Sequence, residues 1–258
     1  MWRKVRIAIL LLVLALAAWT TLIDRLSTTD WDDTLRVGVF PVNAGDDPVS
    51  AAYIRGLGDD SFADIEAFFA EEARRFDLDI AQPVRVERFP EVDEKPPRLE
   101  PDAGIFATLW WSLKLRLYAT RHSSPPGRIP PQIRVFVLYH DPEVTRAVPH
   151  SVGLQKGLVG VVHAFADADM TRSNHVVITH EILHTLGASD KYDPVSLAPL
   201  YPIGFAEPDR KPLYPQRFAE IMAGRLPSDA HTFEIPESLD QALIGEATAL
   251  EIRWTSVP

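Results

Sequence analysis

Residues 174–193, NHVVITHEILHTLGASDKYD, contain the pattern around which the rest of the chain is interpreted. At its centre, His180 and His184 are four positions apart, so an α-helix would present both imidazoles on one face to a single ion. Glu181 follows the first histidine and lies near that face, where its carboxylate is suited to bind a metal-bound water. A bound ion lowers the pKa of such a water from about 16 to about 7, and the neighbouring carboxylate takes the proton as the water attacks a carbonyl. The spacing therefore predicts a hydrolytic zinc site on a helix, because zinc suits imidazole and carboxylate ligands.

The residues after the second histidine extend this pattern. Gly187 comes three positions after His184, where the helix is expected to end in a backbone conformation that glycine tolerates best. Asp190 comes three positions later and is the candidate third protein ligand. Three protein ligands would leave the fourth position to water, as a catalytic zinc site requires.

The complete pattern, His-Glu-x-x-His-x-x-Gly-x-x-Asp, resembles the signature of the metzincin zinc peptidases, in which the last position is usually histidine. The Asp variant is most similar to the snapalysin-type bacterial metzincins. Metzincins also carry a methionine in a tight turn beneath the metal, and residues 219–224 resemble that turn, with Met222 as its methionine. The resemblance covers roughly residues 155–225. It implies an α+β fold of the zincin type, with a mixed sheet, an active-site helix and a mostly irregular or helical C-terminal subdomain.

Two assignments stay open within this resemblance. Glu220 competes with Asp190 as the third ligand, because a second zincin class takes a glutamate from a downstream helix. Several metzincins have a tyrosine two residues after the methionine that assists the transition state, but Gly224 occupies that position here. Tyr192, two residues after Asp190, is the candidate that would donate to the oxyanion instead.

The N-terminus has the composition of a targeting segment. Three basic residues precede residues 7–23, which contain no charge, and this order predicts a membrane anchor or a secretory signal. The run has 17 residues, the lower limit for a bilayer at about 1.5 Å per residue. An Ala-x-Ala at residues 15–17 suits a signal peptidase, but the apolar run continues past it, which favours an uncleaved anchor. The basic flank then places the N-terminus inside and the body outside.

The domain organisation follows from this reading. Residues 1–33 are expected to form the anchor or signal with a short stalk, and residues 34–258 the catalytic domain. Its upper part is expected at 34–187 and its lower part at 188–258. With the family resemblance, this places the protein in the bacterial inner membrane with its catalytic domain in the periplasm or outside. Secretion after signal cleavage is the alternative.

Composition limits the chemistry and the partners. The absence of cysteine excludes disulfides and thiol chemistry. The first 23 residues contain three basic and no acidic groups, so subtracting them from the net charge of −10 leaves −13 on the remainder. Such an acidic domain is a poor candidate for binding nucleic acid, and a peptide or protein substrate is the expected partner. Calcium is compatible with an acidic chain but no motif supports it, and no feature indicates the oligomeric state.

Hydrophobic periodicity predicts alternating strands and helices. Strands are expected at residues 35–42, 84–89 and 133–139, and helices at 60–76, 103–121 and 236–254. The helix at 103–121 is expected to lie in the core, with Trp110 and Trp111 in packing.

Two segments next to the pattern are candidates for the substrate cleft. By resemblance, residues 157–165 are expected to form an edge strand with which an extended peptide pairs, the alternative being an ordinary sheet strand. His163 within it is expected to be a packed residue rather than a cleft residue. Residues 194–215 contain six prolines and are expected to form either a wall of the cleft or a packed plug.

The sequence therefore predicts a zinc-dependent metalloendopeptidase. One alternative is a zinc hydrolase of a non-peptide amide or ester, which the absence of an edge-strand cleft would favour. The other is a non-catalytic cell-envelope binding module, which a metal site with four protein ligands would favour.

Overall fold

A computed structural model describes residues 6, 29–100, 103–123, 127–155 and 157–255. The predicted anchor at residues 7–23 and the first part of the predicted stalk lie outside the described residues. In the part of the chain that is described, none of the helices combines the length and the hydropathy needed to span a bilayer.

A five-stranded mixed sheet organises the N-terminal two thirds of the chain, with the strand order β2-β1-β3-β5-β4. Four of its strands are parallel: β1 (Leu35–Asn43), β2 (Val84–Arg88), β3 (Ile133–His140) and β5 (Val159–Phe165). The last strand, β4 (Val152–Leu154), pairs antiparallel with β5 and forms one edge. The coarse expectation of an α+β fold with a mixed sheet is confirmed.

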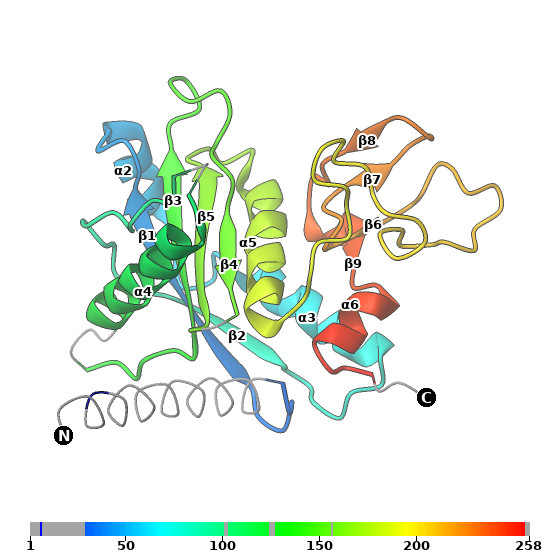
Figure 1. Cartoon of the computed structure of the whole chain (residues 1–258), viewed down its shortest axis with the longest axis horizontal. Helices are drawn as coiled ribbons and strands as arrows, with labels where there is room; N and C mark the ends of the chain where they lie inside the picture. The colour runs from blue at the N-terminus through cyan, green and yellow to red at the C-terminus, as the bar shows by residue number, and fades with distance from the viewer. Residues whose placement is uncertain (1–5, 7–28, 101–102, 124–126, 156, 256–258) are drawn as a thin grey trace.

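Helices cover both faces of this sheet (Figure 1). One face packs against α2 (Pro48–Gly56), α3 (Ala63–Arg75) and α5 (Thr171–Leu186), and the other against α4 (Ile105–His122). The alternation within β1 explains this division, because successive side chains of a strand point to opposite faces. Val37 and Val39 belong to the core with α3 and α5, whereas Phe40 and Val42 belong to the core with α4.

The C-terminal part is mostly irregular and lies beside α5 (Figure 1). Its short elements are β6 (Ala219–Glu220), β7 (Leu226–Pro227), β8 (Phe233–Glu234), the 3-10 turn η1 (Leu239–Gln241), β9 (Ala242–Leu243) and α6 (Glu246–Glu251). The prediction of a single helix over residues 236–254 was wrong in extent. The helical spacing comes from Leu239, Ala242, Leu243, Ala247 and Leu250, but the first three of these lie in η1 and β9 and only the last two lie in α6.

Of the two alternatives for residues 157–165, the edge strand was wrong and the ordinary sheet strand is confirmed. These residues form β5, which lies inside the sheet between β3 and β4. The chain doubles back before it, and the edge is taken by β4. A strand of three residues, all partly exposed, has too little hydrophobic alternation to be recognised from sequence.

Two further expectations need correction. The helix at α4 is not a core helix throughout, because Trp111 is buried but Trp110 is 61% exposed. The second concerns the predicted stalk, because Trp31 within it is packed in the core. Trp31 is only 7% exposed, and its indole N–H donates to the carbonyl of Ile252 at 2.8 Å. Its ring also packs edge-on against Trp254, so the N- and C-terminal parts share one core.

Candidate metal centre

Helix α5 carries the histidine pattern and ends where the sequence predicts. Gly187 has φ 105°, a left-handed conformation, and its N–H donates to the carbonyl of His184. The N–H of Ala188 donates to Leu183, which satisfies another carbonyl of the last turn. A side chain at Gly187 would also collide with Gln155 at 2.4 Å. The glycine therefore lets the chain leave the helix and turn back toward the histidines.

The start of α5 is fixed to its neighbours by polar contacts. The side-chain amide of Asn174 donates to the carbonyl of Phe165 at 2.9 Å, and its oxygen accepts from the N–H of Phe165 at 3.1 Å. The buried His175 places its Nδ1 2.8 Å from the carboxylate of Asp64 on α3. These contacts fix the position of the start of α5 relative to the end of β5 and to α3.

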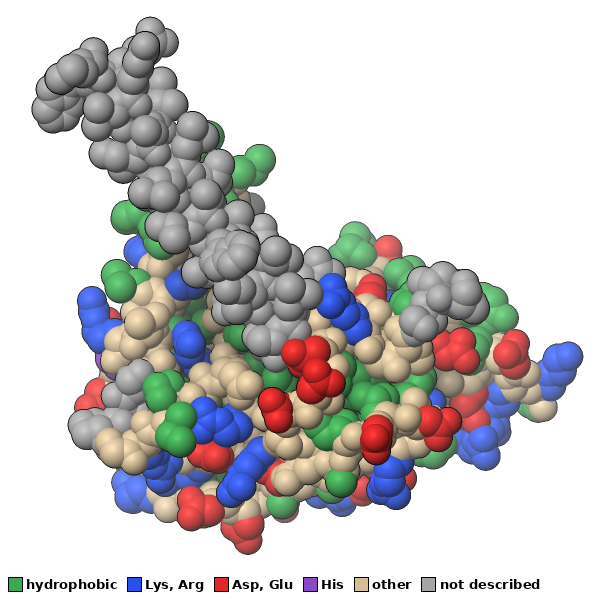
Figure 2. Space-filling view, turned by 90° about the horizontal axis from the view of Figure 1, so that it is seen from below, with side chains coloured by type: hydrophobic (Ala, Val, Ile, Leu, Met, Phe, Trp, Pro, Cys, Tyr) green, Lys and Arg blue, Asp and Glu red, His purple; other side chains and the backbone are tan. Residues whose placement is uncertain are grey.

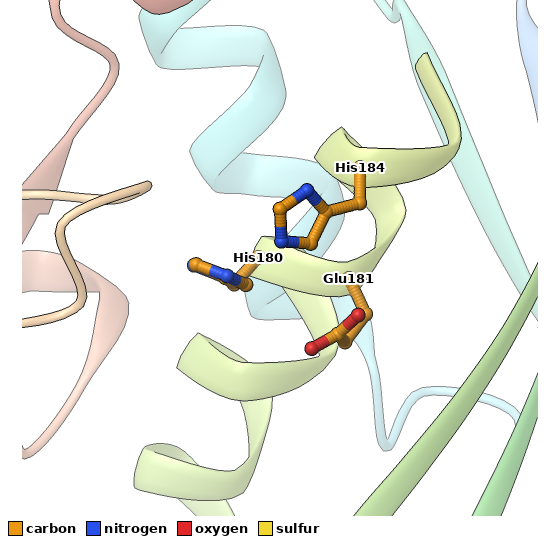
Figure 3. A group of neighbouring side chains, drawn as sticks. All are labelled: His180, Glu181 and His184. Carbon is orange, nitrogen blue, oxygen red and sulfur yellow. The ribbon is translucent and has the colours of Figure 1, made fainter. Parts of the chain in front are cut away.

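Both histidines of the pattern are oriented by backbone carbonyls. His180 Nδ1 lies 2.9 Å from the carbonyl oxygen of Ile221, and His184 Nδ1 lies 2.8 Å from that of Ala188. A carbonyl only accepts, so each Nδ1 carries a proton, and Nε2 is left as the atom that presents a lone pair whenever the ring is neutral. Figure 3 shows the two rings on one side of α5, with Glu181 beside them. This is the arrangement of imidazoles prepared to bind a metal.

Asp190 joins the two histidines. Its Oδ1 lies 3.2 Å from Nε2 of His180 and 3.2 Å from Nε2 of His184. Burial opposes the ionisation of this carboxyl, but when both rings also carry a proton at Nε2, their hydrogen bonds and positive charges outweigh burial and lower the pKa of Asp190. Two lone pairs directed at one anionic oxygen repel each other unless a cation or additional protons lie between them. The three groups therefore form a site that favours a cation.

Glu181 lies next to this group, and one of its carboxylate oxygens has no hydrogen-bond partner among the residues that the structure describes. The side chain is buried, and the oxygen without a partner is Oε2. Burial raises the pKa of Glu181, while the charges of the two histidines oppose that increase. A buried carboxylate oxygen without a partner is costly in a protein interior, which is typical of a group kept for chemistry rather than for stability.

Gly153 allows strand β4 to pass directly over α5. A Cβ atom at this position would stand 2.5 Å from Cβ of His184 and 2.6 Å from the backbone oxygen of Glu181. It would also stand 3.1 Å from Oε2 of Glu181. The sheet edge therefore borders the catalytic candidates only because this residue has no side chain.

The loop that carries Asp190 is held by α6. Ser189 donates from its N–H and its hydroxyl to the carboxylate of Glu251, at 2.8 and 2.7 Å. Lys191 is buried, and its ammonium lies 2.6 Å from the same carboxylate. Both neighbours of Asp190 are thus bound to Glu251 on the C-terminal helix.

The turn at residues 219–224 is present, and it places Glu220 away from the histidines. The carboxylate of Glu220 accepts hydrogen bonds from Thr248 at 2.6 Å, Gly245 at 3.1 Å and Ala223 at 2.9 Å. All of its bonds thus go to the turn and to the start of α6, so the geometry favours Asp190 as the third ligand. Met222 is fully buried in the core, and the carbonyl of its neighbour Ile221 is the one that orients His180.

A cleft with a volume of about 290 Å³ runs beside the site. Its lining includes His180, Glu181 and Tyr192, together with several residues that no motif had indicated: His150, Ser151, Arg225 and Ile235. Burial and the neighbouring carboxylate of Asp190 raise the pKa of Tyr192, which keeps its hydroxyl protonated. His163 does line the cleft, although it is largely buried and its Nδ1 lies 2.8 Å from His140 Nε2. From residues 194–215, Leu197 lines the cleft.

A second hollow of about 760 Å³ lies near β2. It is lined by arginine and acidic side chains of the sheet edge, including Arg85 and Glu87. The histidine pattern does not contribute to it, so the smaller cleft is the candidate site. Comparison with known proteins finds no family model that matches this chain and no curated protein with a significant match.

Proposed function

We propose that this protein is a zinc-dependent metalloendopeptidase of the metzincin type, with His180, His184 and Asp190 as the metal ligands. The observation that carries the proposal is the pair of 3.2 Å distances from Asp190 Oδ1 to the two Nε2 atoms. Ligand bonds of 2.0–2.1 Å in a tetrahedral zinc site place neighbouring ligand atoms about 3.3 Å apart. The two distances from Asp190 are close to that spacing.

The role of Glu181 follows from its position. When bound, the ion would supply a Lewis acid that lowers the pKa of water and polarises the scissile carbonyl. Glu181 takes the proton from the attacking water and passes it to the leaving amine. Its position beside both histidines suits both steps, because a general base must lie within hydrogen-bond reach of the proton that it transfers.

Tyr192 and Arg225 are the candidates for stabilising negative charge on the substrate. Both line the cleft, and the charge of Arg225 lowers the pKa of Tyr192, opposing the larger effects of burial and Asp190. A protonated phenol donates a hydrogen bond to a developing oxyanion. Tyr192 therefore carries the predicted oxyanion role, and Arg225 adds a positive charge to the same wall.

Strand β4 supports a peptide substrate over a non-peptide amide or ester. It is the end strand of the sheet, so one of its edges has no strand partner within that sheet. Gly153 on this strand lies against Glu181. An extended peptide added to such an edge is bound through its backbone, which gives affinity with little dependence on sequence. The end position of β4 in the sheet thus supports the peptide alternative over the non-peptide one.

The ligand set also argues against a non-catalytic module. A structural zinc site uses four protein ligands, whereas His180, His184 and Asp190 supply three. Glu181 is adjacent and unpaired, and a structural site has no use for a base there. We further propose, from the sequence of residues 1–23, that the protein is held at a membrane with its catalytic part outside, and from the family resemblance that this is the bacterial inner membrane.

The test is metal analysis of the full chain together with two substitutions. Elemental analysis is expected to give one zinc per chain. Glu181→Gln is expected to keep the zinc and to lower turnover of a quenched-fluorescent peptide library by a factor of about 10² to 10⁴. His184→Ala is expected to lose both zinc and turnover. A chain that stays free of zinc after incubation with the ion would refute the site, and wild-type turnover in Glu181→Gln would refute the mechanism.

A further inference from the structure

Helix α4 has hydrophobic side chains on two opposite faces. One face packs on the sheet through Trp111, Leu115 and Tyr118. The other bears a row of large apolar side chains that are each more than half exposed: Ile105, Phe106, Leu109, Trp110, Leu113 and Leu117. A surface helix usually keeps its outer face polar, and a contiguous exposed apolar patch marks a place of interaction.

The row follows one side of the helix. At 3.6 residues per turn, Phe106, Leu109, Trp110, Leu113 and Leu117 fall within a stripe about 100° wide. The helix has 18 residues and is therefore about 27 Å long. The stripe thus covers most of the length of α4, and it is a continuous apolar surface rather than the single exposed apolar residues that are common on proteins.

Positive charge borders the stripe. Lys114 and Arg121 are exposed on the same helix, and residues 103–140 contain five basic residues and no acidic one in a chain of net charge −10. Arg121 lies 3.9 Å from Glu94, but both side chains are more than half exposed, so this pair is weak. In Figure 2, hydrophobic side chains lie beside Lys and Arg side chains at the left end of the molecule, where α4 lies in Figure 1.

We propose that the outer face of α4 lies in the surface of a lipid bilayer that contains anionic lipids. An apolar stripe that contains a tryptophan, bordered by lysine and arginine, is the composition of an interfacial helix. The anionic headgroups complement Lys114 and Arg121. A second copy of this face would bring these charges against themselves, and the apolar run at residues 7–23 follows three basic residues. A second copy and the chain's own N-terminal segment are therefore both positively charged, as the border of the stripe is, and do not complement it.

This contact is independent of the proposed peptidase activity. It would add a second attachment to the predicted anchor and would fix how the folded part is oriented at the membrane. Because α4 covers one face of the sheet and α5 the other, the helix with the histidine pattern lies on the side of the sheet away from the lipid.

Site-directed spin labelling tests the proposal, because the chain contains no cysteine. Leu113→Cys places a label on the stripe, and Val195→Cys is the matched control on an exposed apolar residue of a distant loop. The full chain is placed in nanodiscs of phosphatidylcholine alone or with phosphatidylglycerol. Collision of each label with dioxygen, which concentrates in lipid, is compared with collision with a water-soluble nickel chelate.

In nanodiscs with phosphatidylglycerol, the ratio of dioxygen to nickel collisions is expected to rise several-fold for the label at position 113 and to stay at the aqueous value at 195. Adding Lys114→Gln and Arg121→Gln is expected to reduce the docked population by about fivefold for each charge lost. Equal water access at 113 and 195 would overturn the proposal. Equal protection at 113 in both lipids would overturn it in favour of the chain's own apolar run, and spin–spin broadening would favour a second copy.

Discussion

Replacing Glu251 by glutamine should weaken zinc binding from outside the ligand set. The carboxylate of Glu251 binds Ser189 and Lys191, the two neighbours of Asp190. Lys191 is 2% exposed, so the substitution leaves a buried ammonium without its counter-charge. Breaking a fully buried pair costs about 3–5 kcal/mol. Because the side chain of Glu251 is 32% exposed and an amide still accepts hydrogen bonds, the expected loss of stability is about 2 kcal/mol.

The effect on zinc follows from the loosened loop. Partners that orient a metal ligand typically change metal affinity by about 10- to 100-fold when removed, and we expect the same range for Glu251→Gln. Competition with a fluorescent zinc chelator measures the affinity, and urea unfolding of the metal-free protein measures the stability. Glu246→Gln, an exposed position on the same helix, is the control and should change neither.

A double variant separates the loop from general destabilisation. Lys191→Met with Glu251→Leu removes both charges, and replacing a buried ion pair by apolar groups is often neutral for stability. This variant should regain stability but not zinc affinity, because Ser189 still lacks its acceptor. If Glu251→Gln binds zinc as tightly as the wild type while its metal-free form is less stable, the contacts of Glu251 with Ser189 and Lys191 do not position Asp190, and the reasoning is refuted.

Four further outcomes are expected. Gly153→Ala should cost about 1–3 kcal/mol and lower turnover, because its Cβ would overlap the backbone of α5, whereas Gly56→Ala, with open space around it, should be neutral; urea unfolding and peptide cleavage check both. Glu220→Gln should destabilise by about 1–3 kcal/mol, since the carboxylate accepts from three donors, and a loss of zinc on titration would show that it is a ligand after all. Tyr192→Phe should lower kcat by about 10²-fold with zinc retained, and unchanged kcat would remove its oxyanion role. Burial and the neighbouring imidazole of His140 lower the pKa of His163 to about 4, so between pH 6.5 and 4 this side chain gains a proton only in the unfolded chain. The free energy of unfolding should therefore decrease as the pH is lowered from 6.5 to 4, and His163→Gln should make that decrease smaller.

Local sequence patterns were sufficient to predict the elements whose own residues carry a clear periodicity. Alternating Val37 and Val39 predict β1, and the helical spacing of the histidines with the glycine after them predicts α5 and its end. Hydrophobic periodicity does not predict helix α2, because only two of its residues, Ser50 and Ile54, are buried. Its capping residues, Asp47 before the helix and Pro48 at its first position, are the signals that indicate it. The edge strand was assigned to β5 because β4 is too short for alternation to be visible.

The sequence by itself determined which atoms are available for the proposed metal: two imidazoles on one helical face, a carboxylate beside the first, and a second carboxylate after the turn. Only the tertiary structure decided how they are held. The carbonyl of Ile221 orients His180 across 41 positions of sequence, and Glu251 holds the loop of Asp190 from 60 positions beyond Lys191. The geometry that favours Asp190 over Glu220 as the proposed third ligand is likewise tertiary. Both are carboxylates at plausible positions, and packing against Thr248, which local spacing does not encode, directs Glu220 away from the site.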